Sequence, residues 1–258
     1  AHLLDQLDQK QIPNLKYIGK SFLHKSFDQN NDYSVPYFWG TLGIVYNDKF
    51  VKPGAIKTWN DLWSKKYRRQ ILLVDSARDA MGMALVSLGY SMNTTSSIKL
   101  HLAQTKLNSL GPNIKAIISD EMKMYLVQNE AAIGVTWSGE AYEMMEQNPH
   151  LHYVVPKQGS NLWFDNFVIP KTVQNKKAAL KFINFMLEPK NAAQNAEYVG
   201  YATPNTAAQK LLPKKVRDDR QFYPTQSTLK NLQVFRDLGP KKTQEYNDLF
   251  LEFKMYAR

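Results

Sequence analysis

Short apolar runs alternate with longer stretches of helical periodicity along this chain, and that alternation constrains the fold more than any other feature of the sequence. The predicted strands are residues 70–74, 114–118, 132–137, 151–155 and 162–169. Most of these runs lack a polar alternation, which is typical of strands that are buried on both faces. The predicted helices are residues 60–67, 78–88, 97–110, 120–128, 176–187 and 243–256. Strands and helices in this order indicate an α/β fold.

Two aromatic segments suggest how the chain is divided. Residues 33–40 and 161–167 are rich in aromatic side chains and are expected to be extended, so we interpret them as crossings between parts of the molecule. A chain of 258 residues is long enough for one or two compact domains with a sizeable core.

The charge balance raises the question of an anionic partner. The formal net charge is +10, which would suit nucleic acid or a lipid surface. The basic residues, however, occur in short pairs such as Lys65-Lys66 and Lys214-Lys215, with no long basic run. We therefore predict no nucleic-acid partner and keep nucleic-acid binding as an alternative. The longest uncharged stretch, residues 80–98, is too polar to span a membrane.

Two local spacings would fit enzymes or metalloproteins. Ser96 and Lys99 match the spacing of serine-lysine acyl enzymes, but Ser96 is also well placed to cap the helix that follows. His150 and His152 would lie on one face of a strand and could share a metal ion, although no third ligand lies near them in the sequence. The chain contains no Cys, which excludes thiolate chemistry. We favour a helix cap and solvated histidines, and we predict no catalytic residue, metal or cofactor.

Aromatic residues and carboxylates gather at the predicted strand ends. Trp137 ends one strand, Asp79 follows another, and Trp163 and Asp165 lie two residues apart, so that both would point to one side of an extended segment. Tyr201 adds a further ring. A carboxylate beside aromatic faces suits an organic cation, because the rings add a cation–π attraction of about 0.5 to 2 kcal/mol each. Each of these residues could also serve only the core, so the whole set indicates a cation site more strongly than any one member.

At these residues the sequence resembles the spermidine/putrescine-binding proteins of polyamine ABC importers. The resemblance covers the whole chain and rests on many segments in order. They are residues 32–37 with 39–40, 58–63, 72–79, 88–91 with 93–95, 137–139, 155–157, 163–165, 181–185 and 200–205.

The resemblance implies a type II periplasmic-binding-protein fold of two α/β lobes, joined by a hinge, that close on a ligand between them. We expect the first lobe to consist of residues 1–39 and 165–209, and the second of residues 40–164 and 210–258. The family begins with a further strand, helix and strand, so we expect the first lobe to be incomplete. An incomplete sheet leaves an unpaired edge, from which we expect a dimer or low solubility.

The resemblance also implies roles for individual residues. Trp137, Trp163 and Tyr201 would surround the methylene chain of a polyamine, Asp165 would bind an amine, and Asp79 stands where the family has Glu. Two further positions depart from the family pattern. They are Ser76, where a second Asp is usual, and Phe235, where Gln is usual.

The expected function is therefore that of an extracytoplasmic receptor, periplasmic or lipid-anchored, that delivers spermidine or putrescine to the membrane subunits of an ABC permease. The departures at Ser76 and Phe235 leave the preferred polyamine open. A receptor of the same fold for another small solute remains the main alternative.

Overall fold

A computed structural model describes residues 3–257, which divide into two compact units. Unit 1 comprises Ala1–Gly40 and Trp163–Tyr223, and unit 2 comprises Thr41–Leu162 and Pro224–Arg258. Two of the three boundaries fall inside long strands, so the chain passes from one unit to the other in extended conformation.

The strands form one mixed sheet whose order is β3-β2-β4-β1-β6-β7, with β5 paired to β1. They are β1 (Val35–Asn47), β2 (Ile71–Val74), β3 (Ile114–Ile118), β4 (Ile133–Trp137), β5 (Leu151–Val154), β6 (Ser160–Phe167) and β7 (Leu232–Gln233). Strand β2 runs parallel to both β3 and β4, whereas β1 is antiparallel to β4 and β5. The parallel strands β2 and β4 therefore end at the same edge of the sheet.

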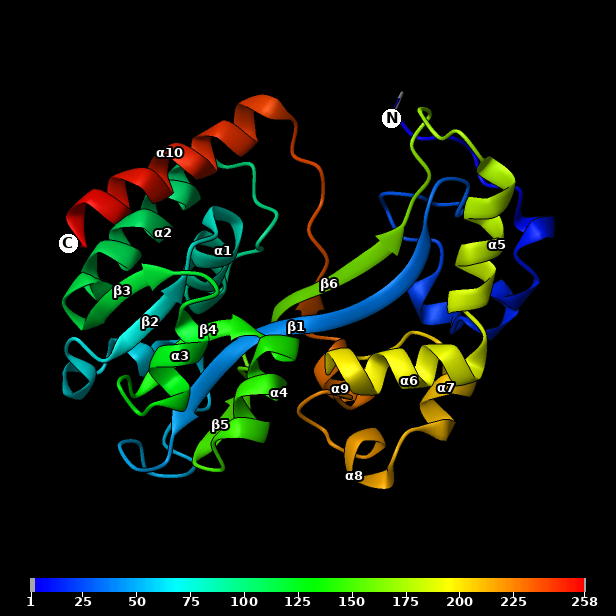
Figure 1. Ribbon diagram of the computed structural model, residues 1–258. Helices are drawn as coiled ribbons and strands as arrows, with labels where there is room; N and C mark the ends of the chain where they lie inside the picture. Colours follow the sequence, from blue (N-terminus) through cyan, green and yellow to red (C-terminus); the bar gives the residue numbers. More distant parts are fainter. Residues whose placement is uncertain (1–2, 258) are drawn as a thin grey trace. The chain divides into compact units, whose positions relative to one another are not determined.

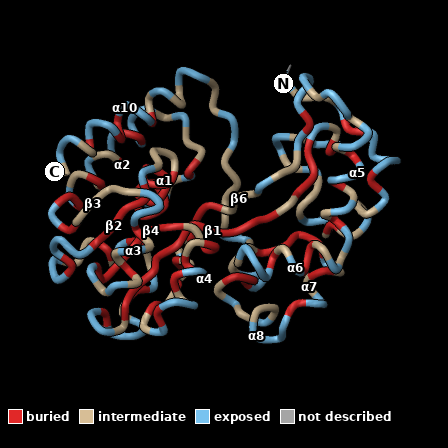
Figure 2. The backbone as a smooth tube through the Cα atoms, viewed as in Figure 1, coloured by how far each residue is buried: buried red, intermediate tan, exposed pale blue. Residues whose placement is uncertain are grey.

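Unit 2 buries its central strands between helices. The α-helices of this unit are α1 (Ala77–Ser87), α2 (Ser97–Leu110), α3 (Met122–Val127), α4 (Ser138–Gln147), α9 (Gln226–Leu229) and α10 (Pro240–Tyr256). Its 3₁₀ helices are η4 (Trp59–Trp63), η5 (Lys65–Tyr67) and η6 (Gly111–Asn113). Helices α1, α2 and α10 group together on one side of β2–β4, and α3 and α4 lie on the other (Figure 1). All four residues of β2 are buried, and Figure 2 shows the central strands as the buried interior.

Unit 1 has a smaller core. Its helices are α5 (Lys176–Met186), α6 (Pro189–Val199), α7 (Thr206–Leu211) and α8 (Lys214–Arg217), with 3₁₀ helices η1 (Gln9–Gln11), η2 (Pro13–Tyr17) and η3 (Lys20–Phe22). Leu180 and Ile183 of α5 pack with Ile12 and Ile18 from the first residues of the chain. None of the helices within residues 3–257 combines the length and the apolarity that a membrane span requires.

The structure contains the predicted strands, and most of the predicted helices match α-helices to within a few residues. The prediction of a continuous helix over residues 60–67 is wrong, because η4 and η5 are two short 3₁₀ helices. Pro189 lies after the end of α5 and also occupies the first turn of α6, where a missing N–H costs nothing. Gly200, with φ 76°, then ends α6 in the left-handed conformation.

The predicted extended crossing at 33–40 overlaps the first part of β1, which begins at Val35 and continues to Asn47. The strand passes through both Gly40 and Gly43. A side chain at Gly43 would meet the ring of Tyr153, since an added Cβ would lie 2.4 Å from Tyr153 Cζ. Gly43 therefore makes room for a buried tyrosine on the neighbouring strand.

The division into units differs from the expected lobes mainly at its third boundary. Residues 210–223 were assigned to the second lobe, but they belong to unit 1. The reason lies in Tyr223, whose hydroxyl accepts a hydrogen bond from the backbone N–H of Thr203 at 3.2 Å. Its ring also lies edge-on to Trp39, with 6.0 Å between ring centroids.

A substitution at Gly43 tests this packing. Gly43→Ala should lower the free energy of unfolding by about 1–3 kcal/mol, because the new methyl group would overpack the site of Tyr153. Gly111→Ala is the matched control, since its added Cβ would lie 3.7 Å from the nearest atom. We expect that control to change stability by no more than about 0.5 kcal/mol in urea denaturation. Equal stability of the two variants would contradict the close approach at Gly43.

Candidate functional site

The carboxyl ends of β2 and β4 bring three of the predicted site residues together in unit 2. Ser76 follows β2 and caps α1, Asp79 lies in the first turn of that helix, and Trp137 ends β4. Because β2 and β4 are parallel neighbours, the residues that follow them meet at one edge of the sheet. Ligands of open α/β sheets bind at such edges.

Asp79 is the charged centre of this group. Only 5% of its surface is exposed. Burial raises the pKa of the Asp79 carboxyl, while hydrogen bonds from Ser76, Asn161 and Trp137 and the charge of Arg78 act in the opposite direction. The Ser76 hydroxyl oxygen also accepts the backbone N–H of Asp79 at 3.4 Å. The carboxylate is thus surrounded by neutral donors.

No cation of residues 3–257 forms an ion pair with Asp79. Arg78 is adjacent in sequence, but its guanidinium lies over other groups: its central carbon is 4.4 Å from the ring centroid of Phe235 and 4.9 Å from that of Tyr246. It also donates to Asn93 Oδ1 at 3.0 Å. A buried carboxylate without a cation is expensive, because removing a charge from water costs several kcal/mol.

Asn161 belongs to the same group and was missed by the sequence analysis. It lies on β6 with 3% exposure, and its Nδ2 donates to Asp79 Oδ1 at 3.5 Å. Its Oδ1 is buried and has no hydrogen-bond partner. The sequence signal for it was weak: an isolated polar residue before Trp163, in a segment read as a crossing.

A second group of predicted residues lies in unit 1. The rings of Trp163 and Tyr201 meet edge to face, with centroids 5.3 Å apart, and Tyr201 also meets Phe38 at 5.6 Å. The indole N–H of Trp163 is buried without a hydrogen-bond partner. Asp165 is exposed, yet partial desolvation raises its pKa. No ion-pair partner of Asp165 lies among the described residues.

The structure places Phe235 beside Arg78, a contact that the sequence did not predict. Its ring lies against the Arg78 guanidinium in unit 2. The backbone on either side of it is held as well, since Asn93 Nδ2 donates to the carbonyl of Val234 at 2.9 Å and Asn93 Oδ1 accepts the N–H of Arg236 at 2.9 Å. Phe235 therefore belongs to the segment that fixes Arg78.

Taken together, each unit offers one carboxylate without a cation and at least one aromatic ring close to it in sequence or space. Such a group can hold an ammonium by charge and hydrogen bonds, and can cover a hydrocarbon chain with ring faces. No trio of His, Asp and Glu among the described residues is arranged to hold a metal ion.

The alternative chemical motifs have structural roles. Ser96 caps α2 by accepting the N–H of Lys99, and the Lys99 ammonium lies 5.0 Å from the ring centroid of Tyr90. His150 Nδ1 and His152 Nε2 lie 2.7 Å and 2.9 Å from the two oxygens of Asp48. The carboxylate of Asp48, whose pKa these contacts lower, thus ties β5 to the end of β1.

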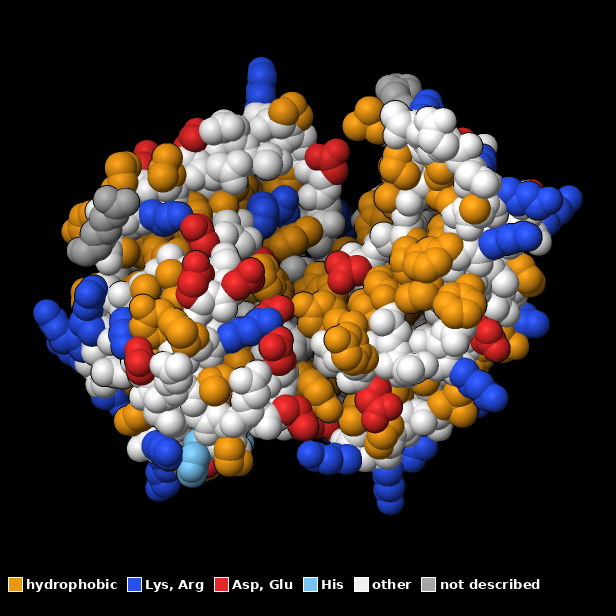
Figure 3. Space-filling view, in the orientation of Figure 1, with side chains coloured by type: hydrophobic (Ala, Val, Ile, Leu, Met, Phe, Trp, Pro, Cys, Tyr) orange, Lys and Arg blue, Asp and Glu red, His pale blue; other side chains and the backbone are white. Residues whose placement is uncertain are grey.

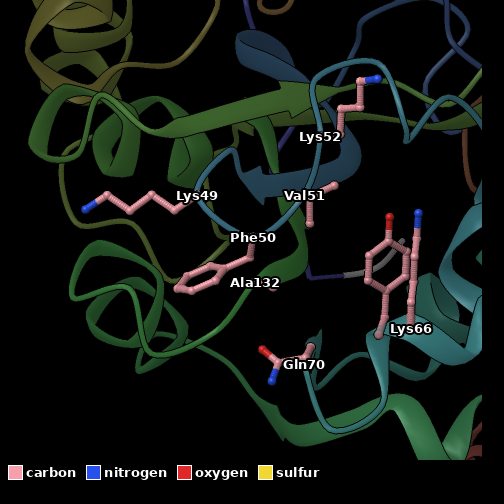
Figure 4. A pocket seen from close by; sticks show the side chains of 8 residues that line it. Lys49, Phe50, Val51, Lys52, Lys66, Gln70 and Ala132 are labelled. Carbon is pink, nitrogen blue, oxygen red and sulfur yellow. The ribbon is translucent and has the colours of Figure 1, made fainter.

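A cavity elsewhere in unit 2 is lined by basic side chains instead of carboxylates. It measures about 480 Å³, and Lys49, Lys52 and Lys66 line it together with Phe50 and Gln70 (Figure 4). No carboxylate lines it, so it does not suit a cation. On the face drawn in Figure 3, Lys and Arg side chains are dispersed among acidic and hydrophobic ones and form no single basic patch.

Comparison with known proteins gives the family. Residues 1–224 match the model of the bacterial extracellular solute-binding proteins. The chain belongs to this family. It is 39% identical to the spermidine/putrescine-binding periplasmic protein of Escherichia coli over 237 residues, which are 92% of this chain and 68% of that protein.

Solved structures agree. The spermidine/putrescine ABC transporter substrate-binding protein PotD from Streptococcus pneumoniae is 54% identical, with a TM-score of 0.93 over 99% of this chain and 79% of that one. A putative spermidine/putrescine ABC transporter protein from Listeria monocytogenes has the same identity and TM-score, over 98% of this chain and 79% of that one. The chain therefore has the α/β fold of this family, as the resemblance implied. The family acts outside the cytoplasm and consists of solute receptors.

The buried charge of Asp79 predicts a pH-dependent effect on stability. Since burial raises its pKa, the folded protein holds this proton to higher pH than the unfolded chain does, and stability falls as the pH rises through the folded value. Without ligand, Asp79→Asn should therefore raise Tm at about pH 8 by about 2–4 °C, the shift that roughly 1 kcal/mol produces in a domain of this size.

The gain should shrink below about pH 4, where Asp79 is protonated in both states. Asp75→Asn is the control, because its carboxylate is exposed and lies 2.7 Å from Lys254 Nζ. We expect it to lower stability by no more than about 1 kcal/mol. A lower Tm for Asp79→Asn at about pH 8, measured by thermal unfolding, would contradict an unpaired buried charge.

Proposed function

We propose that this protein is a receptor for linear polyamines that delivers them to the membrane subunits of an ABC importer. The observation that carries the proposal is the Asp79 carboxylate, which is 5% exposed, is bonded to neutral donors and forms no ion pair with any described residue. A ligand with an ammonium group supplies the missing charge. The relatives that carry spermidine and putrescine in their names support the same ligand class.

Two separate carboxylates favour a ligand with more than one cationic group. Asp79 belongs to unit 2 and Asp165 to unit 1, and neither has an ion-pair partner among the described residues. We propose that Asp79 and Asp165 are each an ammonium-binding residue, and that the ligand is a diamine or triamine.

The aromatic residues suit the hydrocarbon part of such a ligand. We propose that Trp137, Trp163 and Tyr201 contact the methylene chain, since ring faces attract nearby ammonium groups and exclude water from CH₂ groups. Burial of one CH₂ contributes about 0.8 kcal/mol, so a chain of four contributes roughly 3 kcal/mol when fully covered.

Ser76 and Phe235 are the positions that we propose set the preference among polyamines. Ser76 offers a hydroxyl to Asp79 instead of a second negative charge. Phe235 offers no hydrogen bond and packs against Arg78. The proposal involves no catalytic step. It places the protein at the outer face of the cytoplasmic membrane, in a periplasm or held by a lipid anchor.

Calorimetric titration tests the function and its site. Spermidine or putrescine should bind the wild-type protein at physiological salt, and Asp165→Asn should weaken binding by roughly 2–5 kcal/mol, because it removes the charge that pairs with a desolvated ammonium. Trp163→Ala should weaken binding as well, by about 0.5–2 kcal/mol of cation–π attraction together with lost hydrocarbon contact.

Glu197→Gln is the control for Asp165→Asn. Glu197 is an exposed residue of unit 1, so the control makes the same change of net charge at a residue that is not among the proposed ligand contacts. It should leave the affinity unchanged. Unchanged affinity in both Asp165→Asn and Trp163→Ala would refute the site assignment, and absence of polyamine binding by the wild-type protein would refute the function.

A further inference from the structure

We propose that Asn161 is a ligand-contacting residue of this receptor, and that together with Asp79 it makes the site in unit 2 selective for a primary ammonium group. The inference rests on the proposed function, because it takes the ligand to be an amine. It adds a residue that neither the sequence analysis nor the resemblance identified, and it defines which kind of amine end the site accepts.

The first argument is the orientation of the Asn161 amide. Its Nδ2 donates to Asp79 Oδ1 at 3.5 Å. The reverse orientation would bring the amide oxygen against a carboxylate oxygen, and two acceptors repel each other. Because Oδ1 and Nδ2 of Asn161 are bonded to the same carbon, the amide oxygen also lies close to the Asp79 carboxylate.

The second argument is that this oxygen has no partner. Asn161 is 3% exposed, and its Oδ1 is buried without a hydrogen bond. An unsatisfied buried acceptor costs roughly 1–3 kcal/mol. The bond from Nδ2 to Asp79 accounts for an amide at this position, but it leaves the amide oxygen buried and unpaired. A donor that arrives from outside the chain would supply the missing hydrogen bond.

The third argument concerns the shape of that donor. The two unsatisfied features of this group are a carboxylate without a cation and an amide oxygen without a donor. A single –NH₃⁺ group meets both, since it carries one positive charge and three N–H donors. One N–H pairs with Asp79, and a second is available to Asn161. A fully methylated amine keeps the charge but offers one N–H at most, so it leaves one acceptor unpaired.

The donor count gives selectivity as well as affinity. A site built to hydrogen-bond a ligand discriminates strongly against an analogue that lacks the donor, because the acceptor of the protein is left buried and unpaired. We therefore expect the wild-type protein to bind putrescine at least about tenfold more tightly than N,N,N′,N′-tetramethylputrescine.

The test is a double comparison of variant and ligand by calorimetry. Asn161→Leu should weaken putrescine binding by about 10- to 100-fold, the effect of one lost hydrogen bond to a charged donor. It should change the binding of tetramethylputrescine by no more than about threefold, because that ligand has no second N–H to lose. The preference for the primary amine should therefore collapse.

Asn108→Leu is the matched control. Asn108 lies on α2, and its Oδ1 is also buried without a partner, so the substitution makes the same chemical change away from Asp79. It should leave both affinities unchanged. Asn161→Ala serves as a second variant, with the same expected loss of selectivity, should Leu prevent folding.

The outcomes separate the inference from the proposed function. If the wild-type protein binds putrescine and Asn161→Leu weakens both ligands equally, or neither, then Asn161 has a structural role and the inference is wrong while the function stands. If the wild-type protein binds no polyamine, the proposed function fails and the inference fails with it. The inference is confirmed only if the Asn161 variants lose the preference for putrescine over tetramethylputrescine while Asn108→Leu keeps it.

Discussion

The buried carboxylate of Asp79 is the constraint on which the rest of the site depends. A charge that is 5% exposed must be stabilised by the protein, by a ligand, or by both. Among the described residues, Ser76, Asn161 and Trp137 supply neutral donors, and the nearby charge of Arg78 acts on the carboxylate without an ion pair. Neutral donors orient the carboxylate and reduce its desolvation cost without cancelling its charge. A Lys or Arg in their place would stabilise the protein further, but it would compete with any cationic ligand.

The topology of the sheet explains how four residues from three separate segments of the chain reach one point. Parallel pairing of β2 with β4 sets the ends of these strands side by side, so the start of α1 lies next to Trp137. Asn161 comes from β6, which pairs with β7 through Ser160 and Asn161. The N-terminal turn of α1 also favours a negative charge at Asp79, because the helix dipole is positive there. The helix dipole of α1 thus stabilises the Asp79 carboxylate, which forms no ion pair with a described side chain.

The parts of this arrangement differ in how far the sequence could predict them. Apolar runs predicted the strands, and the positions of Asp79 and Trp137 at strand ends indicated a cation site, whereas Ser76 entered only through the resemblance. Asn161 could not be found in this way, since its role comes from a contact with Asp79, 82 residues earlier in the chain. The helix expected at 60–67 failed for a local reason: the capping box of Thr58 and Asp61 closes one short turn, and Ser64 leaves the helical conformation at φ −64° and ψ 128°. The extent of β1 could not be predicted either, because the close approach of Tyr153 that accounts for Gly43 exists only in the folded sheet.

The same reasoning explains why Arg78, the residue before Asp79, does not neutralise it. Successive side chains of an α-helix point in directions about 100° apart, so Arg78 and Asp79 diverge from the first turn of α1. The guanidinium then lies over the rings of Phe235 and Tyr246 and donates to Asn93 and to the carbonyl of Arg236. Arg is suited to this position, because its planar group stacks on rings and donates at its edges at the same time. Phe235 therefore helps to hold Arg78 in a position where its charge lowers the pKa of Asp79 without forming an ion pair with it.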